Sequence, residues 1–175
     1  MSERRLVELV DADGTPVGVC PVGEAHEPPG RLHRAFSVLL FDVDGRVLMQ
    51  RRALTKSRFA GRWTNTCCSH PAPGEDVIAS ALRRLDEELG LRVGALREVG
   101  RFVYRAGDSA SDTVEHEFDH VLVGECAGEP APARVDPREV HGWRWMTPEE
   151  VRDGLRRAPD LHSPWLKDVL RLTFE

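Results

Sequence analysis

The chain has 175 residues, which suits one domain with its own hydrophobic core, and we take residues 1–175 as that single domain. Hydrophobic residues make up 41% and charged residues 30%, the balance of a globular rather than a disordered protein. The formal net charge of −5 argues against bulk binding to nucleic acid or to an anionic membrane, although a few local arginines can still hold a small anion.

The sequence shows no sign of a membrane span or of a secretion signal. No apolar run approaches the ~18 residues that a span needs, and the first residues lack an apolar core and a cleavage pattern. We therefore expect a cytoplasmic monomer whose cysteines are free thiols, with a catalytic or metal-binding role open to them. Cys67 and Cys68 are neighbours and cannot easily pair with each other.

The first elements in the chain are expected to form a β-hairpin followed by a loop. Residues 5–10 alternate roughly between apolar and polar side chains, and residues 17–20 can supply the return strand. Residues 21–30 are rich in proline and glycine and are expected to be a loop that carries His26.

A second hairpin follows. Residues 31–42, which contain His33, and residues 46–52 are β-prone runs on either side of an Asp-Gly turn. Residues 53–62 then form a basic loop, and a short β-prone segment leads from Trp63 to the two adjacent cysteines.

Residues 75–89 give the clearest helix pattern. Apolar residues recur there at a spacing of about 3.6, at Ile78, Ala81, Leu82, Leu85 and Leu89. Gly90 is a typical stop signal. At ~100° per residue, Arg84 and Glu88 lie on one flank of the apolar stripe and can face a cleft. The residues directly before them are expected to face solvent: Arg83 and Glu87.

Two further strands are predicted at residues 96–105 and 114–125, joined by a polar connector at residues 106–112. Strict alternation along the second strand places three acidic residues on one face: Glu115, Glu117 and Asp119. The opposite face then carries Val114, His116, Phe118 and His120.

The C-terminal part begins with a proline-rich loop at residues 127–138 and a strand at residues 139–146. Thr147 and Glu150 form a capping box with a proline between them, which predicts a short helix. Ser163 followed by a proline is expected to cap a last helix that runs to about residue 172. Together these elements indicate the α/β class, as an α+β sandwich in which helices flank a mixed β-sheet.

Five side chains form a candidate metal site. His26, His33 and His70 come from a loop, a strand and a strand end, and Glu115 and Glu117 share one strand face. Each of them alone is more often structural. Together they are too many and too oxygen-rich for a closed structural zinc site, and they suit Mn²⁺, Mg²⁺ or zinc with expanded coordination.

A second group of residues suits a diphosphate. Arg52, Lys56 and Arg84 could bind its oxygens, and Glu88 could hold a Mg²⁺ ion that bridges them. Without further context, an Arg- and Glu-rich helix is more often a solvated lattice of ion pairs.

The segment from Ser69 to Leu91 resembles a degenerate Nudix box. Ser69 stands for the first Gly of that pattern, and the rest matches at Glu75, Arg83, Leu85, Glu87, Glu88, Gly90 and Leu91. Arg84 occupies a position where Nudix hydrolases have a Glu that helps assemble their metal cluster. The reversed charge argues against ordinary Nudix hydrolysis.

A more specific resemblance covers nearly the whole chain. The motifs RLHRAFSVLLFD, QRRALTKSRFAGRWTNTCCSHP, ELG at 88–90, YRA at 104–106, EHE at 115–117 and SPW at 163–165 occur in order. Their combination is similar to type I isopentenyl-diphosphate isomerase, which implies a Nudix-like fold and interconversion of isopentenyl and dimethylallyl diphosphate.

The resemblance implies roles for individual residues. Cys68 and Glu117 would be catalytic with help from Tyr104, and Cys67 would be structural. The metal ligands would be His26, His33, His70, Glu115 and Glu117, with Mn²⁺ or Zn²⁺ as the metal. A substrate-bound Mg²⁺ would lie at Glu88 near the Cys68 carbonyl. The diphosphate would bind Arg52, Lys56 and Arg84, and Trp165 would face the hydrocarbon.

One position departs from the family. Some members carry a diphosphate-binding Lys four residues before the first metal-binding histidine, where this chain has Val22. Either the diphosphate is bound less tightly, or another basic residue such as Arg31 or Arg58 replaces the lysine.

The implied reaction explains the residue types. One proton must be delivered to an alkene carbon and another removed from a neighbouring carbon, through a tertiary carbocation. Glu117 bonded to Tyr104 can relay a proton, and Cys68 is expected to serve as a thiolate base favoured by nearby cations. The indole of Trp165 can stabilise the cation, and its helix can exclude water as a lid. Which of Cys68 and Glu117 is the acid in each direction stays open.

Two other functions remain as alternatives. A Nudix hydrolase of nucleoside or other diphosphates would release phosphate, although Arg84 and the Cys68–His70 segment argue against it. A non-catalytic binding or scaffold domain would bind no divalent metal.

Overall fold

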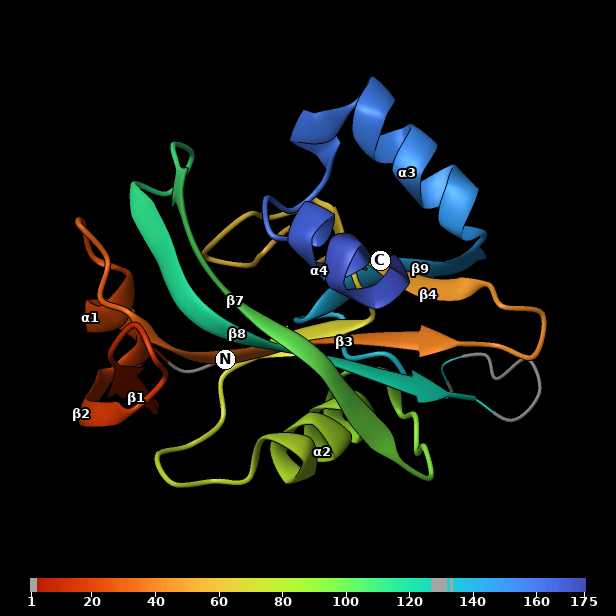
Figure 1. Cartoon of the computed structure of the whole chain (residues 1–175). Helices are drawn as coiled ribbons and strands as arrows, with labels where there is room; N and C mark the ends of the chain where they lie inside the picture. The colour runs from red at the N-terminus through yellow and green to blue at the C-terminus, as the bar shows by residue number, and fades with distance from the viewer. Residues whose placement is uncertain (1–2, 127–131, 133) are drawn as a thin grey trace.

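A computed structural model describes residues 3–126, 132 and 134–175 (Figure 1). Its strands are β1 (Leu6–Val10), β2 (Pro16–Pro21), β3 (His33–Phe41), β4 (Val47–Arg52), β5 (Trp63–Thr64), β6 (Cys67–Ser69), β7 (Leu96–Asp108), β8 (Thr113–Glu125) and β9 (Val140–Met146). Its helices are α1 (Val22–His26), α2 (Val77–Leu89), α3 (Pro148–Arg157) and α4 (Leu166–Phe174), with a 3₁₀ turn at Pro159–Leu161.

The strands form a mixed sheet centred on β3. The path β2-β1-β3-β4-β5 is antiparallel, β6 also pairs antiparallel with β3, and β9 pairs with β4. Only β3 and β8 run parallel among the described pairs, with His33 opposite Glu117 in the register. The long hairpin β7–β8 crosses this centre (Figure 1).

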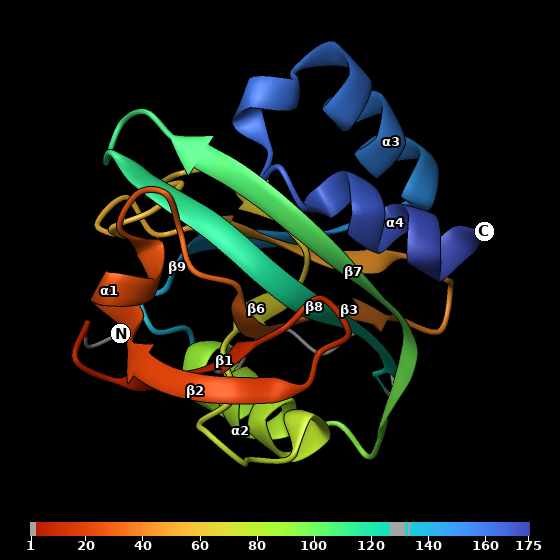
Figure 2. The ribbon, with the colours of Figure 1, turned by 60° about the vertical axis from the view of Figure 1, so that its left-hand side comes forward.

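Helices cover both faces of the sheet. Figure 1 shows α2 on one side and α3 and α4 on the other. Figure 2 brings α1 and the hairpin β1–β2 to the front, beside one end of β8. This arrangement is the predicted α+β architecture with a mixed sheet, and that prediction is confirmed.

The core follows from the alternation of side chains along β3. Phe36, Val38 and Leu40 are fully buried against α2, whose Leu85 and Leu89 face them. Leu39 points to the other face and joins the cluster under α4. A strand that is apolar on both faces is typical of the centre of a covered sheet, and such a strand holds its polar residues in fixed positions.

The predicted helix at residues 75–89 is confirmed, with its first turn at Val77. Asp76 caps it by accepting a hydrogen bond from the Ala79 amide at 2.8 Å, and Gly90 ends it with a left-handed backbone at φ 63°. The capping box at Thr147 and Glu150 is present as predicted, at the start of α3.

Two predictions about local structure are wrong. Residues 22–26, expected as loop, form the short helix α1, in which Val22 and Ala25 are buried. Ser163 does not cap the last helix, which begins after Trp165 without a side-chain cap. The Ser163 hydroxyl is instead 2.8 Å from the Thr64 hydroxyl, a contact between segments 99 positions apart. The expected loop at residues 127–138 lies partly outside the described residues.

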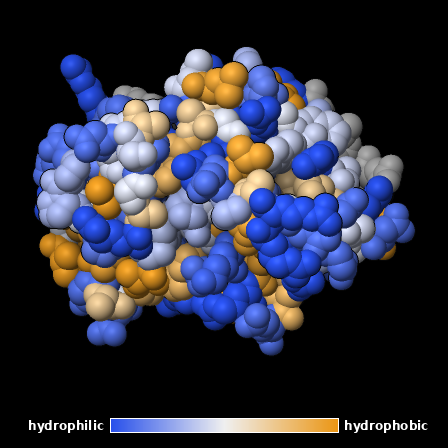
Figure 3. Space-filling model, turned by 90° about the horizontal axis from the view of Figure 1, so that it is seen from above, coloured by the Kyte–Doolittle hydropathy of each residue, from blue (hydrophilic) through white to orange (hydrophobic). Residues whose placement is uncertain are grey.

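On the face seen from above in Figure 3, hydrophobic residues occur in separate groups among hydrophilic ones. None of the described helices combines the length and the apolar character that a membrane crossing requires.

Candidate active site

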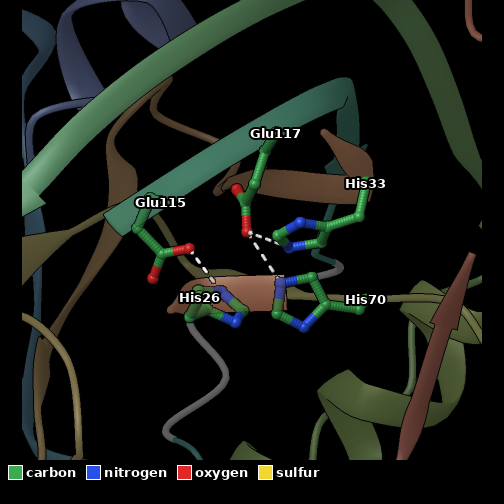
Figure 4. Close-up of side chains that lie close together, drawn as sticks. All are labelled: His26, His33, His70, Glu115 and Glu117. Carbon is green, nitrogen blue, oxygen red and sulfur yellow. Dashed lines mark hydrogen bonds and ion pairs between the residues drawn. The ribbon is translucent and has the colours of Figure 1, made fainter. Parts of the chain in front are cut away.

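The five predicted metal ligands come together in one buried cluster (Figure 4). Each of the five offers a ligand atom, and these atoms all lie within 4.8 Å of one another. They come from the end of α1, the start of β3, the residue after β6 and the first half of β8: His26, His33, His70, Glu115 and Glu117. The parallel pairing of β3 with β8 and the antiparallel pairing with β6 explain why such distant residues meet.

Backbone carbonyls orient two of the imidazole rings. Nδ1 of His26 is 2.7 Å from the Val22 carbonyl, and Nδ1 of His33 is 2.7 Å from the Arg31 carbonyl. When Nδ1 donates to a carbonyl, the lone pair of the ring lies on Nε2, which in both histidines points into the cluster.

The carboxylates fill the centre of the cluster. Nε2 of His26 is 2.7 Å from Glu115, Nε2 of His70 is 2.7 Å from Glu117, and Nε2 of His33 is 3.6 Å from Glu117. Burial lowers the pKa of His70 to about 4, which keeps this ring neutral. Nε2 of His33 is buried and has no hydrogen-bond partner. An inward-facing set of nitrogen and oxygen donors with such an unpartnered atom fits a divalent metal ion.

The two adjacent cysteines point to opposite sides of β6. Cys67 is fully buried in the core under α2, and burial raises its pKa well above the usual value. Cys68 faces the other side of the sheet, where its thiol donates to Oδ1 of Asn65 at 3.0 Å. The Trp165 indole N–H lies 3.2 Å from the Cys68 sulfur.

The surroundings of Cys68 do not favour the expected thiolate. Burial raises the pKa of Cys68 to about 12, and the positive charge of Arg52 does not offset that effect. The Asn65 oxygen is an acceptor, so its contact with Cys68 favours the protonated sulfur. Burial and this contact therefore favour a protonated Cys68 side chain.

Glu117 receives a second strong contact from the opposite side. The Tyr104 hydroxyl donates to its other carboxylate oxygen at 2.6 Å. Burial opposes ionisation of Glu117, but its contacts with His33 and His70 outweigh that effect, and the pKa of Glu117 falls well below the usual value. Burial and the neighbouring carboxylates raise the pKa of Tyr104 well above its usual value, so the phenol keeps its proton.

The candidate catalytic residues line one cavity of about 210 Å³. Its wall includes Cys68, Glu117, Tyr104 and Trp165, together with three basic residues from β4 and the loop after it: Arg52, Lys56 and Arg58. The predicted aromatic wall is present. The Trp165 side chain is buried and lies against Tyr104, with the ring centroids 5.8 Å apart.

The structure divides the three predicted diphosphate ligands between two cavities. Arg52 and Lys56 line the cavity of Cys68, whereas Arg84 and Glu88 line a separate one of about 490 Å³. Arg138 lines both cavities. The predicted contrast along α2 is confirmed, because the Arg84 and Glu88 side chains are buried and those of Arg83 and Glu87 are over 40% exposed.

The sequence pattern missed a residue that joins these two groups. Glu139 is a buried carboxylate that pairs with Lys56 through one oxygen and lies 3.3 Å from Arg84 through the other. In this arrangement Arg84 also binds Glu88 at 2.5 Å, so this glutamate, predicted to hold Mg²⁺, shares its charge with an arginine. No pattern singled out Glu139, because it stands at a loop end.

Asn65 is the second missed residue. Its Oδ1 accepts hydrogen bonds from Thr64, Cys68 and Trp165, and its Nδ2 donates to two backbone carbonyls. The sequence signal that could have identified Asn65 is a polar amide in a β-prone segment, close to the two adjacent cysteines.

Of the two residues considered as substitutes for a lysine at Val22, the structure places only Arg58 in the cavity wall. Arg31 is half exposed and pairs with Glu24 on the surface. Val22 itself is fully buried in the cluster between α1 and the first hairpin.

Comparison with known proteins gives consistent matches. The model of the NUDIX domain family matches residues 31–171. The chain is 58% identical to a protein of Nocardia farcinica (strain IFM 10152) named isopentenyl-diphosphate Delta-isomerase, over 95% of this chain and 93% of that one. It is 42% identical to a protein of the same name from Serratia proteamaculans (strain 568), over 95% and 89%. A crystal structure of DR0079 from Deinococcus radiodurans has the same fold, with a TM-score of 0.79 at 20% identity over 98% and 100% of the chains.

Proposed function

The chain belongs to the NUDIX family and, within it, to the isopentenyl-diphosphate Delta-isomerases, and from this premise we propose how its residues interconvert isopentenyl diphosphate and dimethylallyl diphosphate. The observation that carries the proposal is the single cavity that brings the Cys68 thiol, the Glu117 carboxylate and the Trp165 indole together. Two groups that can exchange protons and an aromatic wall are what the shift of a double bond requires.

Proton transfer is assigned to Cys68 and Glu117. The protonated Cys68 sulfur donates a hydrogen bond to Asn65. The Glu117 carboxylate accepts a hydrogen bond from the Tyr104 hydroxyl. In one direction the thiol protonates the alkene, and the carboxylate removes a proton from the neighbouring carbon of the tertiary carbocation. Microscopic reversibility exchanges the two roles in the other direction.

Trp165 protects the cation. Its ring is 3% exposed, and it packs edge-on against Phe59 with the centroids 5.6 Å apart. An indole face stabilises a positive charge without forming a bond to it, and a sealed wall keeps out the water that would trap the cation as an alcohol. We assign Trp165, which directly precedes α4, as the lid of the cavity.

The histidines and glutamates of the cluster would hold a divalent metal ion, Mn²⁺ or Zn²⁺, in a mixed nitrogen and oxygen site. When bound, such an ion supplies positive charge that keeps the Glu117 carboxylate oriented and tunes its proton affinity. A Mg²⁺ ion with the substrate diphosphate would use Glu88 and the Cys68 carbonyl. The remaining charge of the diphosphate would be met by Arg52, Lys56 and Arg84.

This proposal treats residues 1–175 as one domain that acts as a cytoplasmic monomer. Because Arg84 neutralises Glu88 in the place where Nudix hydrolases collect carboxylates, the diphosphate is held and not cleaved. A small-molecule diphosphate, and neither nucleic acid nor a membrane, is the partner.

Two variants test the assignment. Cys68→Ala and Glu117→Gln are expected to lose nearly all conversion of isopentenyl diphosphate with Mg²⁺ while melting close to the wild-type temperature. Cys67→Ala is the matched control, since this cysteine lies in the core and its loss affects stability and not turnover. Near-wild-type turnover in either site variant contradicts the mechanism, and phosphate release by the wild type indicates a hydrolase instead.

A further inference from the structure

An ion pair lies in the wall of the substrate cavity and has no part in the mechanism above. Nη1 of Arg58 is 3.2 Å and 3.4 Å from the two carboxylate oxygens of Glu3. The Ser57 hydroxyl donates to the same carboxylate at 3.1 Å. Glu3, Ser57 and Arg58 all line the cavity that contains Cys68 and Glu117.

The two partners of this pair differ in how freely they can move. The Arg58 side chain is 10% exposed, whereas the Glu3 side chain is 46% exposed. The backbone before β1 is anchored, because the Glu3 carbonyl accepts from the Gly23 amide at 3.0 Å and the Arg5 carbonyl from the Val22 amide at 2.7 Å. The Glu3 carboxylate can therefore turn away without any rearrangement of the chain.

Among the described residues, the carboxylate next closest to Arg58 after Glu3 is more distant. Nε of Arg58 lies 3.6 Å from Glu115, which belongs to the histidine and glutamate cluster. A guanidinium carries five N–H donors, and Glu3 engages only one of its nitrogens at distances that are long for a charged hydrogen bond. The group is thus a buried cation in the cavity wall with unused capacity for a stronger anion.

A diphosphate is such an anion. It carries more charge than a carboxylate and accepts paired hydrogen bonds from arginine. An ion pair to a half-exposed carboxylate contributes little to stability and is readily exchanged. Arg52 and Lys56 share the wall with Arg58, so a diphosphate bound there meets all three cations.

Resting on the proposed function, we propose that Glu3 is a displaceable internal anion. Its carboxylate holds Arg58 and Ser57 in the empty enzyme and yields both to the diphosphate of the substrate. Arg58 is then a further substrate-binding residue, and Glu3 is a competitor that weakens diphosphate binding.

The test compares Glu3→Gln, Arg58→Ala and the double variant. Glu3→Gln is expected to lower the KM for isopentenyl diphosphate about two- to fivefold, the range of an exposed ion pair, with kcat unchanged. The dissociation constant of inorganic pyrophosphate with Mg²⁺, measured by calorimetry, should fall by the same factor. Arg58→Ala should raise both constants about tenfold or more, as expected for a lost hydrogen bond to a charged group.

The double variant separates displacement from a general effect of charge. In the Arg58→Ala background, Glu3→Gln should change neither constant by more than about 1.5-fold. Glu24→Gln is the matched control, since this half-exposed glutamate pairs with Arg31 outside the cavity wall and its loss should change neither constant.

The inference is overturned if Glu3→Gln leaves both constants unchanged or raises them, or if it has the same effect with and without Arg58. If Arg58→Ala does not fold, the direction in which Glu3→Gln changes the two constants decides the question: a decrease supports displacement, and no change or an increase contradicts it. A wild-type enzyme that binds pyrophosphate without isomerising the substrate contradicts the proposed function and leaves the calorimetric test intact.

Discussion

Removal of one hydroxyl, in Tyr104→Phe, tests the assigned role of Glu117. The hydroxyl donates to the Glu117 carboxylate at 2.6 Å inside a buried site, and the variant keeps the aromatic ring that stacks on Phe102 with the centroids 5.6 Å apart. A hydrogen bond to a charged group contributes about 1.5–3 kcal/mol. If that contact is needed to orient the carboxylate in the transition state, kcat/KM should fall about 10- to 100-fold.

The assay is steady-state conversion of isopentenyl diphosphate, with the melting temperature and bound metal measured on the same preparations. Val103→Ala is the control, because this neighbouring side chain on β7 is 46% exposed and should leave kcat/KM unchanged. A kcat/KM within about twofold of the wild type, with unchanged metal content, would refute the role given to the Tyr104–Glu117 contact.

Three further predictions concern charge, metal and packing. Burial opposes ionisation of Glu139, but Lys56 and Arg84 outweigh it and lower its pKa from 4.5 to about 2. The contribution of ionised Glu139 to the free energy of unfolding is therefore complete above pH ~4.5 and is lost as the pH falls toward ~2. Between these two pH values, the unfolding free energy measured with urea should fall less in Glu139→Gln than in the wild type, by on the order of 2 kcal/mol. Mn²⁺ or Zn²⁺ added to chelator-treated protein should raise the melting temperature, and His33→Ala should reduce that rise. Leu85→Ala leaves a cavity at a fully buried position of α2 and should lower the free energy of unfolding by about 2–5 kcal/mol. Leu82→Ala, at a partly buried position of the same helix, should lower it by less.

The sequence was most informative where one helix or strand determines the outcome. The spacing of Leu85 and Leu89 fixed the buried face of α2 and separated Arg84 from Arg83 correctly, because a helix has a regular geometry. Alternation along β8 placed Glu115 and Glu117 on the same face for the same reason. The meeting of the five cluster residues was predicted from residue types and resemblance, and the pairing of β3 with β6 and β8 supplies its physical basis.

The remaining differences depend on contacts and burial that no local sequence pattern shows. The five residues of α1 lack a capping side chain, and the helix forms where Val22 and Ala25 can be buried against the first hairpin. Ser163 resembled a helix cap, but its hydroxyl bonds to Thr64 across the fold. The Cys68 thiolate was expected from nearby positive charge, and burial together with the Asn65 oxygen reverses that expectation.

The most direct test of the central claim is to follow isopentenyl diphosphate and Mg²⁺ with the enzyme in D₂O by NMR. The proposed exchange of protons through Cys68 and Glu117 predicts dimethylallyl diphosphate that carries deuterium at the carbon that was protonated, and an intact diphosphate. Absence of the isomer, an isomer without solvent deuterium, or release of inorganic phosphate would contradict the account.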